Sequence, residues 1–243
     1  MKFEDMINNV TLGDCYEVIK SIPDKSIDCI YTDIPYLYNC GGGGNSPLAK
    51  RIRTVTDEYL KDIKDGINFE IFDDMIRVMK KINIFIWCSK LQILDIIKYF
   101  VEQKGCVFEI LIWCKTNPTP ATNNVWLPDV EYCLYFREKG VRLNDGYELK
   151  SKWYISPINQ SDKEKFNHPT IKPLNLVERH IKHTTQENDI VLDCFCGSGT
   201  TCVACKNTNR RYIGIELNPK WYKVAVDRLN NIQADGQITM FTN

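Results

Sequence analysis

The chain of 243 residues carries 31 basic and 31 acidic side chains, so its formal net charge is zero. Its 44% hydrophobic and 26% charged fractions exclude a disordered or fibrous protein. The balanced charge means that any nucleic-acid contact must come from a local basic patch. No apolar run approaches the roughly 20 residues that cross a bilayer, and the acidic N-terminus lacks an export signal. We therefore expect a cytoplasmic protein without membrane contact.

Short β-rich runs alternate with helical patterns along the chain. The sequence predicts strands at 27–32, 82–87, 106–113, 131–136, 190–193 and 211–216. It predicts helices at 14–21, 70–81, 91–104, 174–183, 200–207 and 219–231. This alternation favours an α/β fold with a mostly parallel, doubly wound sheet. Such sheets bind ligands at the carboxyl ends of their strands.

Three segments depart from the alternation within what we expect to be a single domain, 1–243. Segment 37–68 contains four consecutive glycines and is predicted to be a long mobile loop. Segment 137–167 is mixed in charge and lacks clear periodicity, and 234–243 forms a tail. No repeat or linker marks a second domain.

Eleven cysteines are present, the tightest cluster being Cys194, Cys196, Cys202 and Cys205. Paired CxxC elements are missing, which favours buried free thiols over zinc. His180 and His183 are three residues apart on a predicted helix but have no nearby ligand set. We therefore expect no metal.

A glycine-rich turn follows the predicted strand 190–193 and opens the helix 200–207. Its residues run Asp193-Cys-Phe-Cys-Gly197-Ser-Gly199-Thr-Thr201, and Glu216 ends the next strand. Glycines let the backbone approach a ligand, and the acid is placed to accept hydrogen bonds from ribose hydroxyls. This order predicts a nucleoside-containing cofactor. A phosphate loop is not indicated, because no GK[ST] follows.

A second cluster, Asp33-Ile34-Pro35-Tyr36, follows the predicted strand 27–32. One interpretation is a strand followed by a proline turn. The other is a site for an amine on a flat ring. Asp33 and the Ile34 carbonyl would then accept the two N–H groups, and Tyr36 would stack on the ring, which contributes ~1–3 kcal/mol per base.

With these motifs in this order, the chain resembles the β-class amino DNA methyltransferases. These enzymes methylate adenine N6 or cytosine N4 with S-adenosylmethionine, and their D/S-P-P-Y motif precedes an F-x-G-x-G motif, as DIPY precedes FCGSG here. Gly13-Asp14 and His168-Pro-Thr-Ile-Lys-Pro173 match two further family elements. Trp113-Cys-Lys-Thr-Asn-Pro118 and Glu131-Tyr132 resemble elements that border the target-base pocket.

The resemblance implies the Rossmann-like methyltransferase fold and a set of site residues. The implied catalytic residues are Asp33, Ile34, Pro35 and Tyr36. The implied cofactor-binding residues are Asp14, Cys15, His168, Thr170, Lys172, Asp193, Phe195, Gly197, Gly199, Thr200, Glu216 and Leu217.

One residue departs from the family pattern, because Ile34 stands where the family usually has proline. The carbonyl that this position contributes is retained, and Pro35 restricts Ile34 to extended conformations. In the family that the chain resembles, an Asp at the first motif position goes with adenine N6 rather than cytosine N4, so the resemblance implies adenine as the target. The target base must flip out of the duplex to reach such a site.

DNA, duplex or single-stranded, is the expected partner. Lys50, Arg51, Arg53, Lys150 and Lys152 are the expected phosphate contacts, with ordinary solvated surface as the alternative. Lys163 and Lys165 extend the second group, and by the resemblance 137–167 is the target-recognition segment.

The tail Gln237-Ile-Thr-Met-Phe241 resembles peptides that bind replication sliding clamps, with a packed apolar tail as the alternative. Related enzymes are sometimes dimers, which leaves a homodimer open.

Other functions compete with a DNA adenine-N6 methyltransferase. They are a cytosine-N4 enzyme, an RNA or nucleotide methyltransferase, a DNA-binding regulator with a vestigial site, and an NAD-dependent dehydrogenase. The dehydrogenase would use the glycine turn and Glu216 but leaves DIPY and HPTIKP unexplained. Neither the recognition sequence nor the presence of a partner nuclease can be read from the chain.

Overall fold

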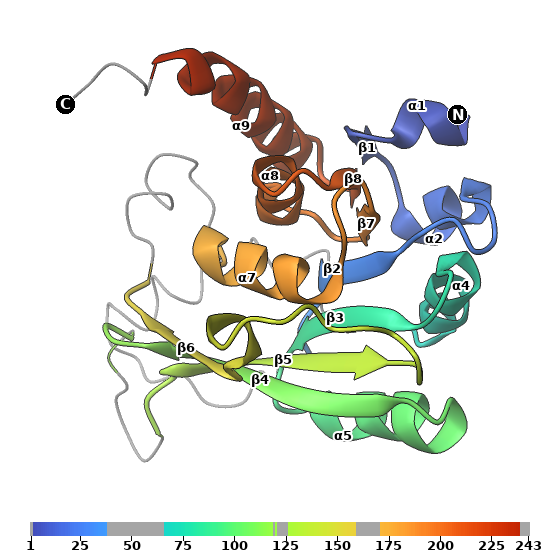
Figure 1. Ribbon diagram of the computed structural model, residues 1–243, viewed down its shortest axis with the longest axis vertical. Coiled ribbons are helices and arrows are strands. Elements are labelled where there is room, and N and C mark those ends of the chain that lie inside the picture. The colour runs from blue at the N-terminus through green and yellow to red at the C-terminus, as the bar shows by residue number, and fades with distance from the viewer. Residues whose placement is uncertain (1, 38–65, 119, 121–125, 159–170, 239–243) are drawn as a thin grey trace, which may run out of the picture.

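The computed structural model describes residues 2–37, 66–118, 120, 126–158 and 171–238, with side chains as far as Asn230. In this part of the chain one eight-stranded sheet has the order β1-β8-β7-β2-β3-β5-β4-β6 (Figure 1). The strands are β1 (Asn9–Leu12), β2 (Cys29–Asp33), β3 (Asn83–Cys88), β4 (Val107–Lys115), β5 (Val130–Arg137), β6 (Trp153–Ser156), β7 (Ile190–Asp193) and β8 (Arg211–Glu216). All neighbours are parallel except β5, which runs antiparallel to β3 and β4. The predicted mostly parallel α/β sheet is confirmed.

Helices cover both faces of the sheet (Figure 1). They are α1 (Phe3–Met6), α2 (Cys15–Val18), η1 (Ile19–Ser21), α4 (Glu70–Val78), α5 (Ile93–Ile97), η2 (Lys98–Gln103), η3 (Glu148–Lys150), α7 (Leu174–Thr184), α8 (Thr200–Asn207) and α9 (Pro219–Ile238). Neighbouring strand residues point to opposite faces, so Ile30 packs with α2, α4 and α5, whereas Tyr31 packs with α7 and α8. This two-sided burial is the doubly wound arrangement that the alternating elements predicted.

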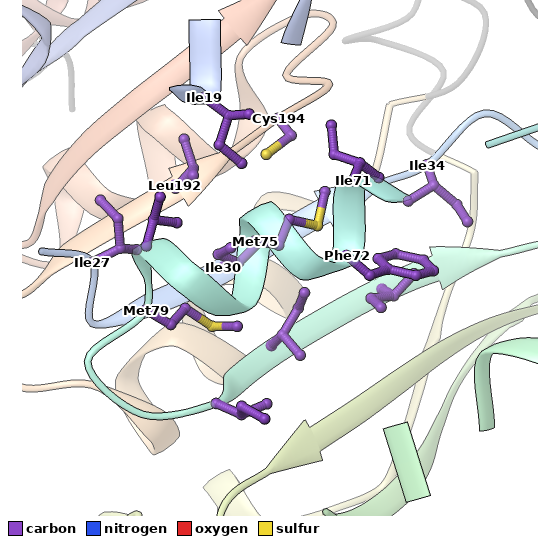
Figure 2. Close-up of a cluster of buried hydrophobic side chains, with 14 of the residues drawn as sticks. Ile19, Ile27, Ile30, Ile34, Ile71, Phe72, Met75, Met79, Leu192 and Cys194 are labelled. Carbon is purple, nitrogen blue, oxygen red and sulfur yellow. The ribbon is translucent and has the colours of Figure 1, made fainter. Parts of the chain in front are cut away.

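The first of these two cores lies under α4 (Figure 2). Phe72 and Met75 of this helix are fully buried and belong to the same cluster as Ile30 of β2. Each such side chain contributes about 1.5–3 kcal/mol through burial. Ile34, directly after β2, is 2% exposed and joins the cluster. The side chain that replaces the family's usual proline therefore anchors the motif in the core.

Several element boundaries differ from the predicted ones. Helix α4 ends at Val78 rather than residue 81, because Met79 turns to extended backbone and bridges to Ile27. The helix predicted at 91–104 is divided between α5 and the π-helical η2. Strands β1 and β6 were not predicted, and α9 continues to Ile238, into the tail segment. In the part of the chain that the structure describes, no helix has the length and hydropathy needed to cross a membrane.

Candidate active site

The predicted catalytic motif lies at the carboxyl end of β2, where Asp33 pairs in register with Trp87 of β3. The Ile34 N–H donates to the Trp87 carbonyl at 3.2 Å, a bond that proline has no proton to make. Gln92 Nε2 donates to the Pro35 carbonyl at 2.9 Å. The isoleucine therefore continues the parallel ladder by one bond, and the motif backbone is fixed on both sides.

A chain of alternating charges runs from this motif into the protein. The Lys172 ammonium lies 2.5 Å from Asp33 Oδ2 and 3.0 Å from Glu131 Oε2, and the Lys172 side chain is only 8% exposed. Lys115 lies 2.6 Å from the other oxygen of Glu131. Lys172 also donates to the Tyr36 hydroxyl at 3.3 Å. Buried charges are stable when paired in this way, so the position of Asp33 depends on Lys172.

Burial and pairing act in opposite directions on these groups. Burial raises the pKa of Asp33, and the Lys172 ammonium offsets only part of the rise. Burial would also raise the pKa of Glu131, but Lys172 and Lys115 outweigh it and lower that pKa to about 2. For Lys172 burial acts to lower the pKa, and the two carboxylates reverse this and raise it. Lys172 and Glu131 are therefore ionised at neutral pH, and Lys172 favours the charged form of Asp33.

The second oxygen of Asp33 is available to a ligand. Oδ1 is buried and has no hydrogen-bond partner among the described residues. A buried carboxylate oxygen without a partner is costly unless something else supplies a donor. Two aromatic rings lie near the ammonium that holds Asp33, since Lys172 Nζ lies 5.5 Å from the Tyr36 ring centroid and 5.0 Å from that of Trp87. The site thus combines a carboxylate acceptor with a neighbouring aromatic ring, that of Tyr36.

The predicted glycine turn lies between β7 and α8. Gly197 and Gly199 adopt positive φ angles of 52° and 75°. At Gly199 an added Cβ would lie 3.1 Å from the Cβ of Ala225, so a side chain there would crowd α9 and strain the backbone. Asp193 accepts hydrogen bonds from Thr32 Oγ1 at 3.1 Å and from the Phe195 N–H at 3.2 Å. Burial raises the pKa of Asp193 to about 7, against these hydrogen bonds.

Glu216 ends β8 beside this turn. Its two oxygens accept from the Gly197 N–H and the Asn218 N–H, each at 2.8 Å. The Gly13 N–H donates to the Glu216 carbonyl at 2.9 Å, which brings Asp14 to the same edge of the sheet. Asp14 caps α2 by accepting from the Tyr16 N–H at 2.9 Å. Two acids and a tight glycine turn at adjacent strand ends have the chemistry that ribose and adenine require.

Other predicted residues have different surroundings. Cys15 is 3% exposed and lies in the hydrophobic core, whereas Leu217 is 59% exposed. Thr200 is buried, and its hydroxyl accepts from Arg228 at 2.8 Å. Lys172, predicted to bind the cofactor, is paired with Asp33, and its contact with the cofactor stays a prediction. Five predicted residues lie outside the described part of the chain: Lys50, Arg51, Arg53, His168 and Thr170.

The described basic residues, Lys150 and Lys152, lie next to acids. Lys150 pairs with Asp145 at 3.0 Å and Lys152 with Glu109 at 2.5 Å. Lys152 directly precedes β6 and is level in register with Leu111 of β4, which is level through β5 with Trp87, the partner of Asp33. Lys152 therefore lies toward the same strand ends as Asp33, with three strands between them. Their role in DNA binding stays a prediction.

The sequence did not predict a role for Gln92 or Trp87, which fix the motif. It indicated Lys115 and Glu131 only as parts of elements that border the base pocket. The signal for the ion-pair chain was faint, because Lys115 lies in the segment 113–118 and Glu131 opens a predicted strand. Nothing local indicated that Lys172 would join them to Asp33.

The fold and site define a class: a methyltransferase with a doubly wound sheet, a glycine turn for an adenosyl cofactor and an acceptor for an amine. A family model described as DNA methylase, for N6 and N4 methyltransferases, matches residues 27–227. The chain therefore belongs to the N6/N4 DNA methylase family, and it is a DNA methyltransferase whose cofactor is S-adenosylmethionine.

Curated relatives and solved structures agree with this assignment. Type II methyltransferase M2.LlaDCHI of Lactococcus lactis subsp. cremoris is 33% identical, with 90% of this chain and 87% of the relative covered. M2.DpnII of Streptococcus pneumoniae is 31% identical over 89% and 87%. The structure of an M1.HpyAVI–SAM complex has a TM-score of 0.67 and 29% identity, covering 90% of this chain and 98% of that one. The PvuII cytosine-N4-specific methyltransferase, with a TM-score of 0.65 and 15% identity over 92% and 90%, shares the fold.

Proposed function

We propose that the protein transfers a methyl group to the exocyclic N6 amine of a flipped-out adenine within a specific DNA sequence. The proposal rests on the surroundings of the two carboxylate oxygens of Asp33. One of its oxygens is anchored by Lys172 at 2.5 Å, and the other is buried without a described partner. This arrangement suits an amine that brings its own N–H donors.

The residues around Asp33 make the target amine more nucleophilic. Its lone pair is delocalised into the ring, so it is a poor nucleophile until it becomes pyramidal. Hydrogen bonds to Asp33 Oδ1 and the Ile34 carbonyl favour that form and stabilise the positive charge that develops on nitrogen. Tyr36 offers the ring on which the base stacks. Alignment of the amine by these three residues supplies much of the rate.

S-adenosylmethionine, when bound, supplies an electrophilic methyl group on a sulfonium. Its adenosyl part fits the edge formed by Gly197, Gly199 and Glu216, where positive φ angles favour glycine and the acid accepts from the Gly197 N–H. Asp14, at the start of α2, adds a second acid on the same edge. This edge adjoins β2, because β7 pairs with both β8 and β2. The cofactor and the amine would therefore be neighbours across adjacent strand ends.

Adenine is favoured over cytosine because the motif begins with Asp33, and the resemblance links Asp at this position to N6 chemistry. Curated relatives named as type II methyltransferases support a site-specific enzyme of that kind. A target amine within the duplex is out of reach, so the proposal includes base flipping into the pocket at Asp33. It also includes target recognition by segment 137–167 and phosphate contacts by the basic residues named above.

The proposal is tested by methyl transfer from labelled cofactor to unmethylated DNA with Asp33→Ala and Asp33→Asn. Both variants should lose at least about 100-fold in turnover, which is the usual loss when one such electrostatic group is removed. Cofactor binding, followed by tryptophan fluorescence, should change less than about threefold, because Glu216 and the glycine turn are untouched. Asp24→Asn, on an exposed ion pair with Arg77, is the matched control. Turnover by Asp33→Ala close to that of the control would overturn the role of Asp33.

Three finer features also belong to this proposal: a cytoplasmic location, a homodimer and docking of Gln237–Phe241 on a sliding clamp. The helix α9 includes the first two residues of that tail, and residues 239–243 lie outside the described part of the chain. A pull-down with purified clamp should be lost on Phe241→Ala. Absence of binding at micromolar concentrations would end the clamp hypothesis, and sedimentation would decide between monomer and dimer.

A further inference from the structure

A cavity of about 330 Å³ opens on the α7 side of the sheet, distinct from the methyl-transfer site. Strands β3, β4 and β5, the helix α7 and the segment 143–152 enclose it. Its floor is formed by side chains that are almost fully buried: Phe85, Leu111, Tyr135 and His180. Its rim includes the more exposed Leu143 and charged side chains. The volume lies at the lower end of the range of about 300–1,000 Å³ that small-molecule sites occupy.

The floor of this cavity is aromatic. The rings of Phe85 and Tyr135 are stacked with centroids 4.3 Å apart and an interplanar angle of 26°. The imidazole of His180 lies nearly parallel to Phe85, at 5.2 Å and 6°. Because Phe85 is stacked between these two rings, a planar ligand in the cavity meets ring edges, and edge-to-face contact is a geometry that aromatic rings favour.

Hydrogen bonding decides which nitrogen of His180 carries a proton. Trp87 Nε1 donates to the Tyr31 hydroxyl at 3.0 Å, and that hydroxyl lies 3.1 Å from His180 Nδ1. An indole nitrogen is a donor only, so the proton of Tyr31 is directed to Nδ1. Burial lowers the pKa of His180 to about 3, so the imidazole is neutral and its single proton is on Nε2. Nε2 is buried and lacks a partner among the described residues. The floor therefore presents one unused N–H donor.

Most of the charged side chains at the rim of the cavity neutralise one another. Lys152 pairs with Glu109 at 2.5 Å, and Lys150 pairs with Asp145 at 3.0 Å. Arg137 reaches the Val141 carbonyl at 3.5 Å. With four of the rim charges paired to one another, the cavity has no strong preference for an ionic ligand.

We propose that this cavity is a second ligand site, for a neutral one- or two-ring aromatic compound with a hydrogen-bond acceptor. The ligand packs edge-to-face against Phe85 and Tyr135, and its acceptor atom receives the Nε2–H of His180. The rim of Leu143 and the paired ions closes over its outer edge. The proposal does not depend on which base the enzyme methylates.

The test uses the full chain, labelled with ¹⁵N, and two probes of the same shape. Quinoline carries a ring-nitrogen acceptor and is neutral above pH 7, whereas naphthalene has none. The Nε2–H resonance of His180, assigned by its loss in His180→Gln, is followed by NMR during titration. Quinoline should shift it saturably, with a dissociation constant on the order of 1 mM for a ligand of this size. It should bind about fivefold more tightly than naphthalene, the ratio that one ordinary hydrogen bond provides.

Matched tryptophan variants keep the test specific to the cavity. Leu143→Trp fills the mouth and should abolish the quinoline shift. Leu94→Trp introduces the same side chain at a 62% exposed position on α5 and should leave it unchanged. Equal binding of quinoline and naphthalene, or retention of the shift in Leu143→Trp, would overturn the proposal. So would the absence of a saturable shift in the unmodified protein.

Discussion

Replacing Lys172 by glutamine perturbs the site at the point where it depends most on charge. The ammonium is 8% exposed and lies between two carboxylates, at 2.5 Å from Asp33 and 3.0 Å from Glu131. Removing one partner from a buried ion pair costs about 3–5 kcal/mol. Asp33 retains 30% exposure, so we expect the lower end, about 3 kcal/mol. For a domain of this size that corresponds to a fall in Tm of roughly 6–12 °C.

Lys172→Gln should also shift the pH dependence of kcat, and the direction of the shift follows from the charges around Asp33. Burial already raises the pKa of Asp33, and the ammonium offsets part of that rise, so its loss raises the pKa further. In the proposed mechanism the ionised carboxylate accepts a hydrogen bond from the target amine, so activity should be lost as pH falls through this pKa. The acid limb of the kcat profile should therefore move to higher pH, with a loss of about 100-fold at neutral pH and partial recovery in alkali.

The assay measures kcat and cofactor affinity from pH 6 to pH 10. Lys20→Gln, on an exposed pair with Glu17, is the control and should behave as the unmodified protein. A pH-independent loss would refute the electrostatic reasoning. A rise in the dissociation constant of S-adenosylmethionine with kcat unchanged would show instead that Lys172 serves the cofactor.

The remaining predictions concern the cofactor edge and the motif backbone. Glu216→Gln should weaken cofactor binding about 10- to 100-fold in a fluorescence titration, because an NH₂ group replaces one oxygen that accepts from a backbone N–H; unchanged affinity would contradict this. Ile34→Pro should lower the free energy of unfolding by about 2–4 kcal/mol in urea, since it removes the bond to Trp87 and a buried side chain; a more stable variant would show that the family's proline fits equally well. Burial raises the pKa of Asp193 to about 7, so stability should fall by up to about 4 kcal/mol as pH rises from 4 to 7. Asp193→Asn should remove this part of the slope, and an identical slope in both proteins would argue against it.

Elements with strong local signals were predicted to the residue. The strands β7 and β8 and the helix α8 have the bounds expected from 190–193, 211–216 and 200–207. Their apolar runs are bounded by glycine, charged or polar residues, so the pattern alone defines them. By contrast, β1 (Asn9–Leu12) and β6 (Trp153–Ser156) are four-residue edge strands whose existence depends on the partner strand. A sequence window contains no information about that partner.

The residues of the candidate site likewise fall into those that the local sequence predicts and those that depend on distant segments. Asp33, Gly199 and Glu216 were found because strand ends carry function in a doubly wound sheet. The pairing of Lys172 with Asp33 joins residues 139 positions apart and follows only from how α7 approaches the sheet. The π-helical turn η2 was missed because its bonding differs from the 3.6-residue period that the pattern assumes.

The nucleoside that becomes methylated is the most direct evidence for adenine-N6 methyl transfer by this protein. The purified protein is incubated with labelled S-adenosylmethionine and unmethylated duplex DNA, the DNA is digested to nucleosides, and the labelled species is identified by mass spectrometry. N6-methyladenine is the expected labelled nucleoside, and it should be absent when Asp33→Ala is used. N4-methylcytosine as the labelled nucleoside, or no labelled nucleoside from the unmodified protein, would contradict it.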